Sequence, residues 1–147
     1  MSIYAAIVTV NGSADLPAEL DLNSKGLVYG LNLPHHWEIL TWLASELGVK
    51  PLNDFVFADP EDLDFLEGEA YEVHNERVST QKEWYEPSEG YETVCAMLQF
   101  LRDADRNSIN RFFPEDSIEW IEWDLRAYQL ILGKAVEGNE PFRIVIC

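Results

Sequence analysis

Carboxylates are the most frequent reactive side chains of this 147-residue chain, and they concentrate in its middle. Residues 54–92 hold thirteen Asp or Glu and two Lys or Arg, which gives this stretch a net charge of −11 out of −17. Large aromatic rings share the stretch, among them Tyr71, Trp84 and Tyr85. Such rings offer wide contact area with few rotatable bonds, and carboxylates speed the encounter with a cationic surface. The combination predicts a surface that binds a basic protein.

The residues expected on this surface are aromatic or acidic and fall between residues 59 and 92. They are Tyr71, Trp84, Tyr85, Glu86, Glu89, Asp62 and Asp64. The same residues have a second interpretation, in which the rings form the core of a small sheet and the acids form a solvated face. The two interpretations differ in one observable, the exposure of the rings.

His35 and Glu38 lie three residues apart on the first predicted helix, away from its apolar stripe. Together with Trp42 they could line a pocket beside this helix, and this is the basis of an alternative hypothesis, a small-ligand-binding or hydrolytic enzyme. The sequence has no His-Glu-x-x-His motif, and its acidic cluster lacks the register and central glycine of a calcium loop. We therefore expect no metal and no other cofactor.

Recognisable catalytic motifs are absent from the sequence. It contains no Gly-x-Ser-x-Gly elbow, no phosphate-binding loop and no Gly-x-Gly-x-x-Gly fingerprint. Cys95 falls on the apolar face of a predicted helix, where a packed thiol is commoner than a nucleophile. No catalytic residue is predicted, and a non-catalytic protein is the favoured class.

The elements that would position these residues follow from hydrophobic periodicity. Residues 2–10 and 142–146 are β-branched and aromatic runs, so both ends of the chain are expected in one sheet. A short acidic helix should start at Asp59 and close at Gly68, and residues 69–86 predict two short strands or a long ordered loop. The main helices are predicted over residues 34–47, 88–105 and 118–136.

The predicted fold is one α+β domain over residues 1–147. A small, mostly antiparallel sheet that includes the N- and C-terminal strands should pack against three main helices. The last of these helices has apolar residues on two sides, so both sides need cover from the same chain or from a partner. A homodimer is a third hypothesis, and its expected seam is Trp120, Trp123 and Leu130.

The overall charge narrows the class of partner. A net charge of −17 opposes binding to nucleic acid and to an anionic membrane surface, whereas it favours a cationic protein. No segment has the roughly 18 apolar residues that a membrane span needs. Two cysteines and no disulfide framework predict a cytoplasmic protein.

The segment from Trp84 to Val94 contains an aromatic-Pro-x-Glu-Gly helix start, with Pro87, Ser88, Glu89 and Gly90. This start resembles that of small bacterial α+β proteins of unassigned function, and the resemblance covers about a dozen residues and transfers no catalytic residue. It implies a bacterial accessory protein. In its acidic character the chain is also similar to immunity proteins that neutralise nuclease toxins.

Overall fold

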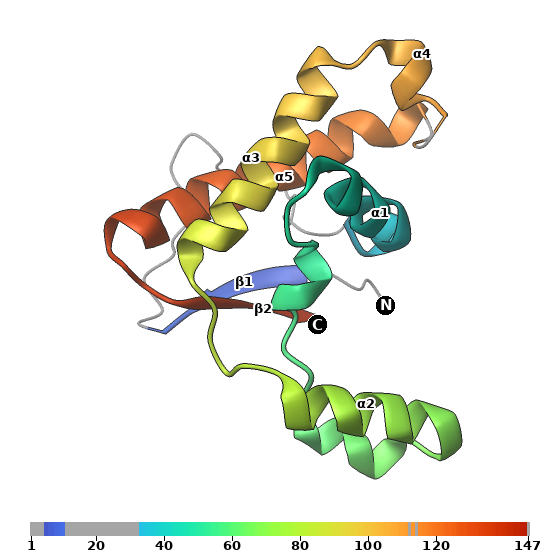
Figure 1. The fold of residues 1–147 in the computed structure, drawn as a ribbon, viewed down its shortest axis with the longest axis vertical. Coiled ribbons are helices and arrows are strands. Elements are labelled where there is room, and N and C mark those ends of the chain that lie inside the picture. Colours follow the sequence, from blue (N-terminus) through green and yellow to red (C-terminus); the bar gives the residue numbers. More distant parts are fainter. Residues whose placement is uncertain (1–4, 11–32, 112, 114, 147) are drawn as a thin grey trace, which may run out of the picture.

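The two ends of the chain meet in a two-stranded antiparallel sheet, as the sequence predicted. The computed structural model describes residues 5–10, 33–111, 113 and 115–146. Strand β1 (Ala5–Thr9) pairs with β2 (Phe142–Ile146), and Ala5 lies opposite Ile146 in the register (Figure 1). The fold class is thereby confirmed as α+β with the sheet formed by the terminal strands.

Helices make up most of the remaining chain. Three α-helices match the three predicted main helices, and two further α-helices lie where no helix was expected. In chain order the helices are η2 (Leu33–His36), α1 (Trp37–Leu47), η3 (Leu52–Phe55), η4 (Pro60–Phe65), α2 (Gly68–Thr80), α3 (Pro87–Asp103), α4 (Arg106–Ile109) and α5 (Glu115–Glu137).

Local chemistry sets several of the helix ends. Gly48 ends α1 with a φ of 73°, a left-handed conformation that glycine adopts without a Cβ clash. Pro87 stands at the first position of α3, where its missing N–H costs no helical hydrogen bond. The side chain of Asp59 accepts a hydrogen bond from the Glu61 N–H and caps η4. The ends at Gly48 and Asp59 agree with the sequence prediction, whereas α3 begins at Pro87, one residue before the predicted start at Ser88.

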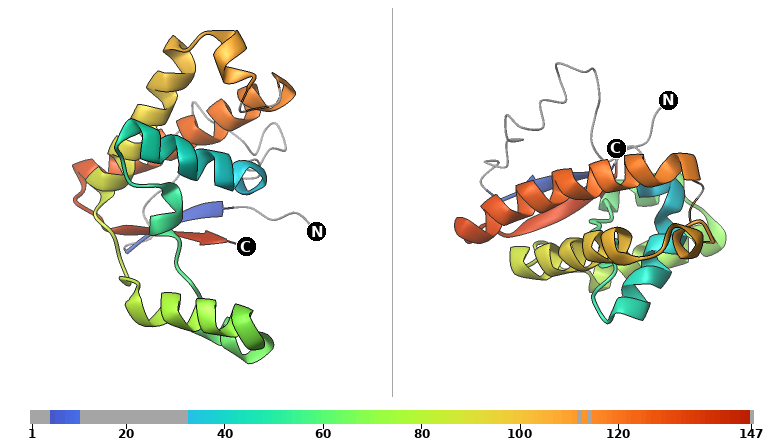
Figure 2. Two further views of the ribbon diagram at one scale, coloured as in Figure 1. Left: turned by 45° about the vertical axis from the view of Figure 1, so that its right-hand side comes forward. Right: turned by 90° about the horizontal axis from the view of Figure 1, so that it is seen from above.

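The core lies between the helix pair α3–α5 and the inner face of the sheet. The helices α3 and α5 run side by side along most of α3, and the strands lie against the same body (Figure 2). The Tyr128 hydroxyl donates a 2.6 Å hydrogen bond to the Ala5 carbonyl, which ties α5 to β1. The largest fully buried side chains include Tyr128, Phe55, Phe113, Phe142, Leu33, Leu40 and Met97.

The second edge of β2 is also paired, by two short stretches of extended chain. Tyr85 forms an antiparallel bridge with Phe142, and Val56 forms a parallel bridge with Ile144. The segments before and after α2 therefore both return to the same strand. As a consequence α2 is held out from the body between two fixed points.

The prediction for residues 69–86 was wrong, because Gly68–Thr80 is the helix α2. Gly68, expected to end a helix, begins one with a φ of 62°. The alternation of Tyr71 and Val73 imitated a strand, whereas Leu66, Ala70 and Val73 recur at helical spacing. This segment buries none of its residues, so a core-facing stripe was not available to reveal it.

Candidate protein-binding surface

Helices η4 and α2 form an arm that stands apart from the body of the molecule. We call residues 59–80 the acidic arm. Figure 1 shows it beneath the sheet, and in the left view of Figure 2 α2 lies outside the packed helices. Its main packing is that of α2 on η4. No residue from 59 to 80 is buried, which is unusual for two consecutive helices of a folded domain.

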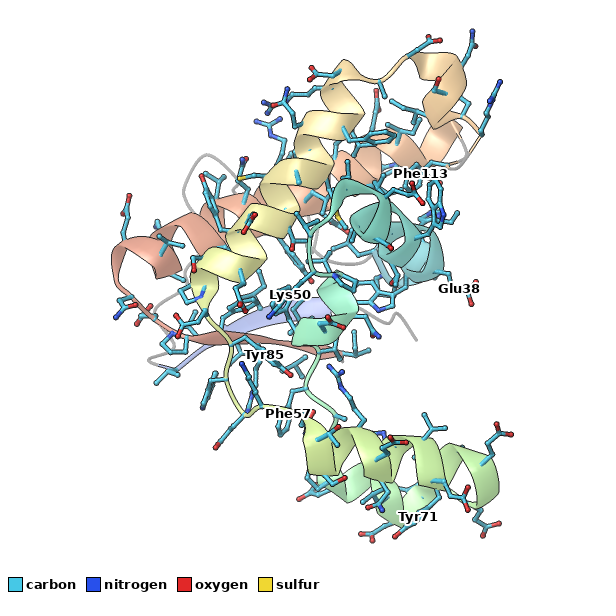
Figure 3. The ribbon with its side chains drawn as sticks, in the orientation of Figure 1. Glu38, Lys50, Phe57, Tyr71, Tyr85 and Phe113 are labelled. Atoms are coloured by element: carbon cyan, nitrogen blue, oxygen red, sulfur yellow. The ribbon has the colours of Figure 1, made fainter. Side chains whose placement is uncertain are left out.

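Charge and apolar surface coincide on the acidic arm. It carries eight carboxylates against the single Arg77, so its net charge is −7. Phe65 is 85% exposed, Val73 63% and Tyr71 40%. Figure 3 shows Tyr71 on α2 among carboxylate side chains. Exposed rings beside carboxylates are the arrangement that distinguishes a binding surface from a solvated acidic face.

A shallow apolar groove runs along one face of α2. It has a volume of about 560 Å³ and is open to solvent. The spacing of its lining residues is that of one helical face. They are Leu66, Glu69, Ala70, Val73, His74 and Arg77. A partner could therefore insert an apolar side chain into the groove while carboxylates surround it.

Polar contacts fix the arm to the body. The Nη2 atom of Arg77 donates to the carbonyl oxygens of Asn53, Asp54 and Val56 at 3.0, 3.1 and 2.9 Å. These carbonyls lie at and just after η3, whose C-terminal end attracts a cation. The Gln81 side chain accepts from the Ala58 N–H and donates to the Ala58 carbonyl. The arm is positioned by few and specific contacts.

The structure divides the predicted partner-binding residues into two groups. Asp62, Asp64 and Tyr71 are exposed on the arm. Trp84 and Tyr85 are half-buried at the entry to α3, where Tyr85 packs edge-on against Phe55. Beside them Glu86 is exposed, and Glu89 forms a 3.0 Å ion pair with Lys50. The seven residues therefore belong to two segments, the arm and the entry to α3.

Phe65 and Val73 are exposed residues of the candidate surface that sequence reasoning missed. Phe65 is the most exposed large apolar side chain of the described residues. The signal available in the sequence was the helical spacing from Leu66 to Val73 inside an acidic segment. The signal was weak because over so few residues the apolar positions fit both the alternation of a strand and the spacing of a helix.

The predicted pocket beside the first helix is a surface hollow. It measures about 330 Å³ and is lined by residues 34–39, including His35 and Glu38, which are both exposed. Trp42 is 44% exposed and does not line it. Burial lowers the pKa of His36 in the same hollow, and the neighbouring His35 lowers it further. No enclosed cleft unites the three predicted residues.

The proposed dimer seam is mostly covered within the chain. Trp120 is 46% exposed, whereas Trp123 and Leu130 are half-buried. Ala127 and Ile131 on the same side of α5 are fully buried. The second apolar stripe of α5 therefore finds most of its cover in its own domain, and Trp120 is its exposed end.

The described residues hold neither a metal-binding cluster nor a membrane-spanning helix. Within the described ranges no group of three or more His, Cys, Asp or Glu side chains is placed to hold a metal ion. Over the same residues, none of the helices combines the length and the apolar character that crossing a bilayer requires. Neither a protein-family model nor a curated protein nor a solved structure matches the chain.

Proposed function

We propose that this protein is a non-catalytic protein-binding module whose acidic arm binds a cationic partner, in the manner of an inhibitor or immunity protein. The observation that carries the proposal is that Phe65, Tyr71 and Val73 are exposed on two helices that bury none of their own residues. Covering a side chain such as Phe65 or Val73 stabilises a complex by about 1.5–3 kcal/mol in favourable cases. The partner would bury the apolar side chains that the chain itself leaves exposed.

Charge selects the class of partner. The arm concentrates −7 of the net charge of −17 in residues 59–80. A field of this sign accelerates association with a basic protein and repels nucleic acid and anionic membranes. The sequence resemblance and the two cysteines favour a bacterial cytoplasm as the place where the partner is met.

The test is affinity capture from the source cell at low salt. The bait is compared with a double variant of the arm, Phe65→Ser with Val73→Ser, and with Trp120→Ser, which removes an exposed ring on α5. We expect a basic protein that the wild type and Trp120→Ser retain and the arm variant loses. In a titration of the purified pair the arm variant should bind at least about tenfold more weakly. Recovery of no basic protein that depends on the arm would refute the proposal.

The two other functions have less support. An enzyme beside α1 would use His35 and Glu38, but their hollow is open and both side chains are exposed. A homodimer would use Trp120 with the half-buried Trp123 and Leu130. Light scattering of wild type against Trp120→Glu tests the dimer, since an unchanged mass removes it.

A further inference from the structure

Arg143 is held in an unusual environment on the outer side of β2. Its neighbours Phe142 and Ile144 are buried in the core, so Arg143 points to the other face of the strand. The guanidinium carbon lies 4.1 Å from the centre of the Phe57 ring and 4.4 Å from that of Trp84. A ring stacked on a guanidinium does not occupy its in-plane N–H groups, which remain able to donate hydrogen bonds.

Those N–H groups have no acceptor among the described residues. The Nε atom is buried and makes no hydrogen bond, and no carboxylate of the described part lies within 4.0 Å of the guanidinium. An unmatched buried donor destabilises the folded state. The chain has 27 acidic residues, yet none of those in the described part forms an ion pair with Arg143. The Nη groups of Arg143 are not buried, and they would donate to a planar acceptor bound in the groove that Arg143 lines.

Arg143 lines a groove of about 450 Å³ between the sheet and the acidic arm. This volume is in the range of sites that hold small molecules. Phe57, at the junction of sheet and arm in Figure 3, contributes apolar surface to it. The remaining lining residues are Val56, Ala58, Asp59, Asp62, His74, Val145 and Ile146.

The arm side of the groove supplies hydrogen-bond acceptors. His74 Nε2 lies 2.7 Å from the Asp59 carbonyl oxygen, and because a carbonyl only accepts, Nε2 carries the hydrogen. In the neutral ring Nδ1 is then an acceptor. The Asp62 carboxylate is exposed and has no hydrogen-bond or ion-pair partner among the described residues. A donor group and an acceptor group thus border one groove.

Charge decides which ligand fits. A simple anion would meet Asp59, Asp62 and the field of a chain of net charge −17, whereas a simple cation would leave the Arg143 donors unused. A zwitterion satisfies both ends and carries no net charge. Apolar surface from Phe57, Val145 and Ile146 suits a hydrophobic side chain on the same ligand.

We propose that this groove binds a zwitterionic ligand with an apolar side chain, as found in a free α-amino acid or a short peptide. Its carboxylate binds the Arg143 guanidinium, and its ammonium group faces Asp62 and His74. The free amino acid and the short peptide share this chemistry and differ only in the distance between their charged ends. Asp62 and His74 belong to the acidic arm, but the site does not include Phe65, Tyr71 or Val73. Ligand binding and binding of the basic partner are therefore tested at different residues.

The first test titrates the wild-type protein with four probes and follows backbone amide shifts by NMR. L-leucine and Leu-Leu carry both charges, N-acetyl-leucine has only the carboxylate, and leucinamide has only the ammonium group. We expect saturable binding of leucine or Leu-Leu with shifts around Arg143, and at least about tenfold weaker binding of both blocked probes. The tighter of the two zwitterions identifies the source. No saturable binding up to about 10 mM, or equal binding of the blocked probes, would overturn the proposal.

The second test uses matched variants. Asp62→Asn should weaken leucine or Leu-Leu binding several-fold, while Asp64→Asn, equally exposed on the arm and outside the groove, should leave it unchanged. Arg143→Gln should abolish binding, and Arg126→Gln, an exposed arginine on α5, serves as its control. Arg143→Gln also removes the contacts of the guanidinium with Phe57 and Trp84. If this variant unfolds, the comparison of Asp62→Asn with Asp64→Asn still tests the proposal. Equal effects of Asp62→Asn and Asp64→Asn would refute the assignment.

Discussion

Gly90 is the residue where the backbone of α3 comes closest to the aromatic core. A Cβ at this position would collide with the Phe142 ring, with Cε1 at 2.9 Å, and would press on Leu132 at 3.3 Å. Phe142 is fully buried and packs on Phe55 with 5.2 Å between ring centroids, so it cannot yield at low cost. Alanine gains about 1 kcal/mol of helix propensity, but overpacking costs about 1–3 kcal/mol. We expect Gly90→Ala to lower the free energy of unfolding in urea by up to about 2 kcal/mol.

Gly133 on α5 provides the control for this prediction. Its added Cβ would lie 3.5 Å from the Tyr91 ring, an ordinary contact distance. Gly133→Ala should therefore keep the propensity gain and raise the free energy of unfolding by up to about 1 kcal/mol. Equal stabilities of the two alanine variants would contradict the close approach at Gly90.

His36 links stability to pH. Burial lowers its pKa below the usual value near 6.5, and the charge of His35 lowers it further. As the pH falls, the imidazole of His36 is therefore protonated in the unfolded chain at a higher pH than in the folded chain. The stabilising contribution is present above about pH 6.5 and is lost as the pH falls through the lower folded pKa.

We predict that His36→Gln loses less stability than wild type between about pH 7.5 and pH 5. Urea unfolding at both pH values measures the difference, and comparison of the two chains cancels the shared titration of the carboxylates. His35→Gln removes only the smaller cause, so it should reduce the pH effect in part. A pH effect that is identical in wild type and His36→Gln would count against the lowered pKa of His36.

At the scale of elements, the acidic arm depends on the side chain of Arg77. Its Nη2 atom shares two hydrogens among three carbonyl oxygens at the end of η3, and a charged hydrogen bond of this kind contributes about 1.5–3 kcal/mol. We expect Arg77→Met to open α2 locally while the melting temperature of the body changes little, because the arm buries no core residue.

A glutamyl-specific protease measures this opening, since α2 contains Glu69, Glu72 and Glu76. Cleavage within α2 should be several-fold faster in Arg77→Met than in wild type. Lys82→Met removes the same charge from an exposed side chain just beyond α2 and should leave the rate unchanged. An unaltered rate in Arg77→Met would show that other contacts hold the arm.

The elements differ in how far the sequence could predict them. The terminal strands and the helices α3 and α5 carry long apolar patterns that match their burial, and these were predicted. The helix α2 has no buried stripe and is positioned by Arg77 and Gln81 through contacts distant in the sequence, so no local pattern announced it.

The candidate site was likewise predictable only where it does not depend on contacts between residues distant in the sequence. Asp62, Asp64 and Tyr71 were placed on the binding surface by composition alone, and they are exposed there. Trp84 was assigned to the same surface, yet its ring stacks on Arg143, a partner that only the pairing of Tyr85 with Phe142 brings near. The exposure of a ring depends on such tertiary neighbours, and a single sequence does not show which distant residues become neighbours.

At the scale of the whole molecule, the charge of −17 is concentrated and therefore acts locally. The arm holds −7 of it, and Glu72 and Glu76 face each other one helical turn apart on α2. Like charges at this spacing cost about 0.2–0.5 kcal/mol, and salt screens them over about 10 Å at 0.1 M. The arm should therefore be the part of the fold that responds most to ionic strength.

We predict that raising NaCl from about 0.02 to 0.3 M slows amide hydrogen exchange in α2 more than in α3. The triple variant Asp64→Asn, Glu72→Gln and Glu76→Gln should begin with slower exchange in α2 and lose most of the salt response, because its repulsion is already reduced. The matched variant Glu46→Gln, Glu92→Gln and Glu119→Gln removes the same charge from exposed positions outside the arm and should keep the wild-type response. If both triple variants respond alike, the net charge rather than its concentration in the arm governs stability, and the arm loses its distinct electrostatic character.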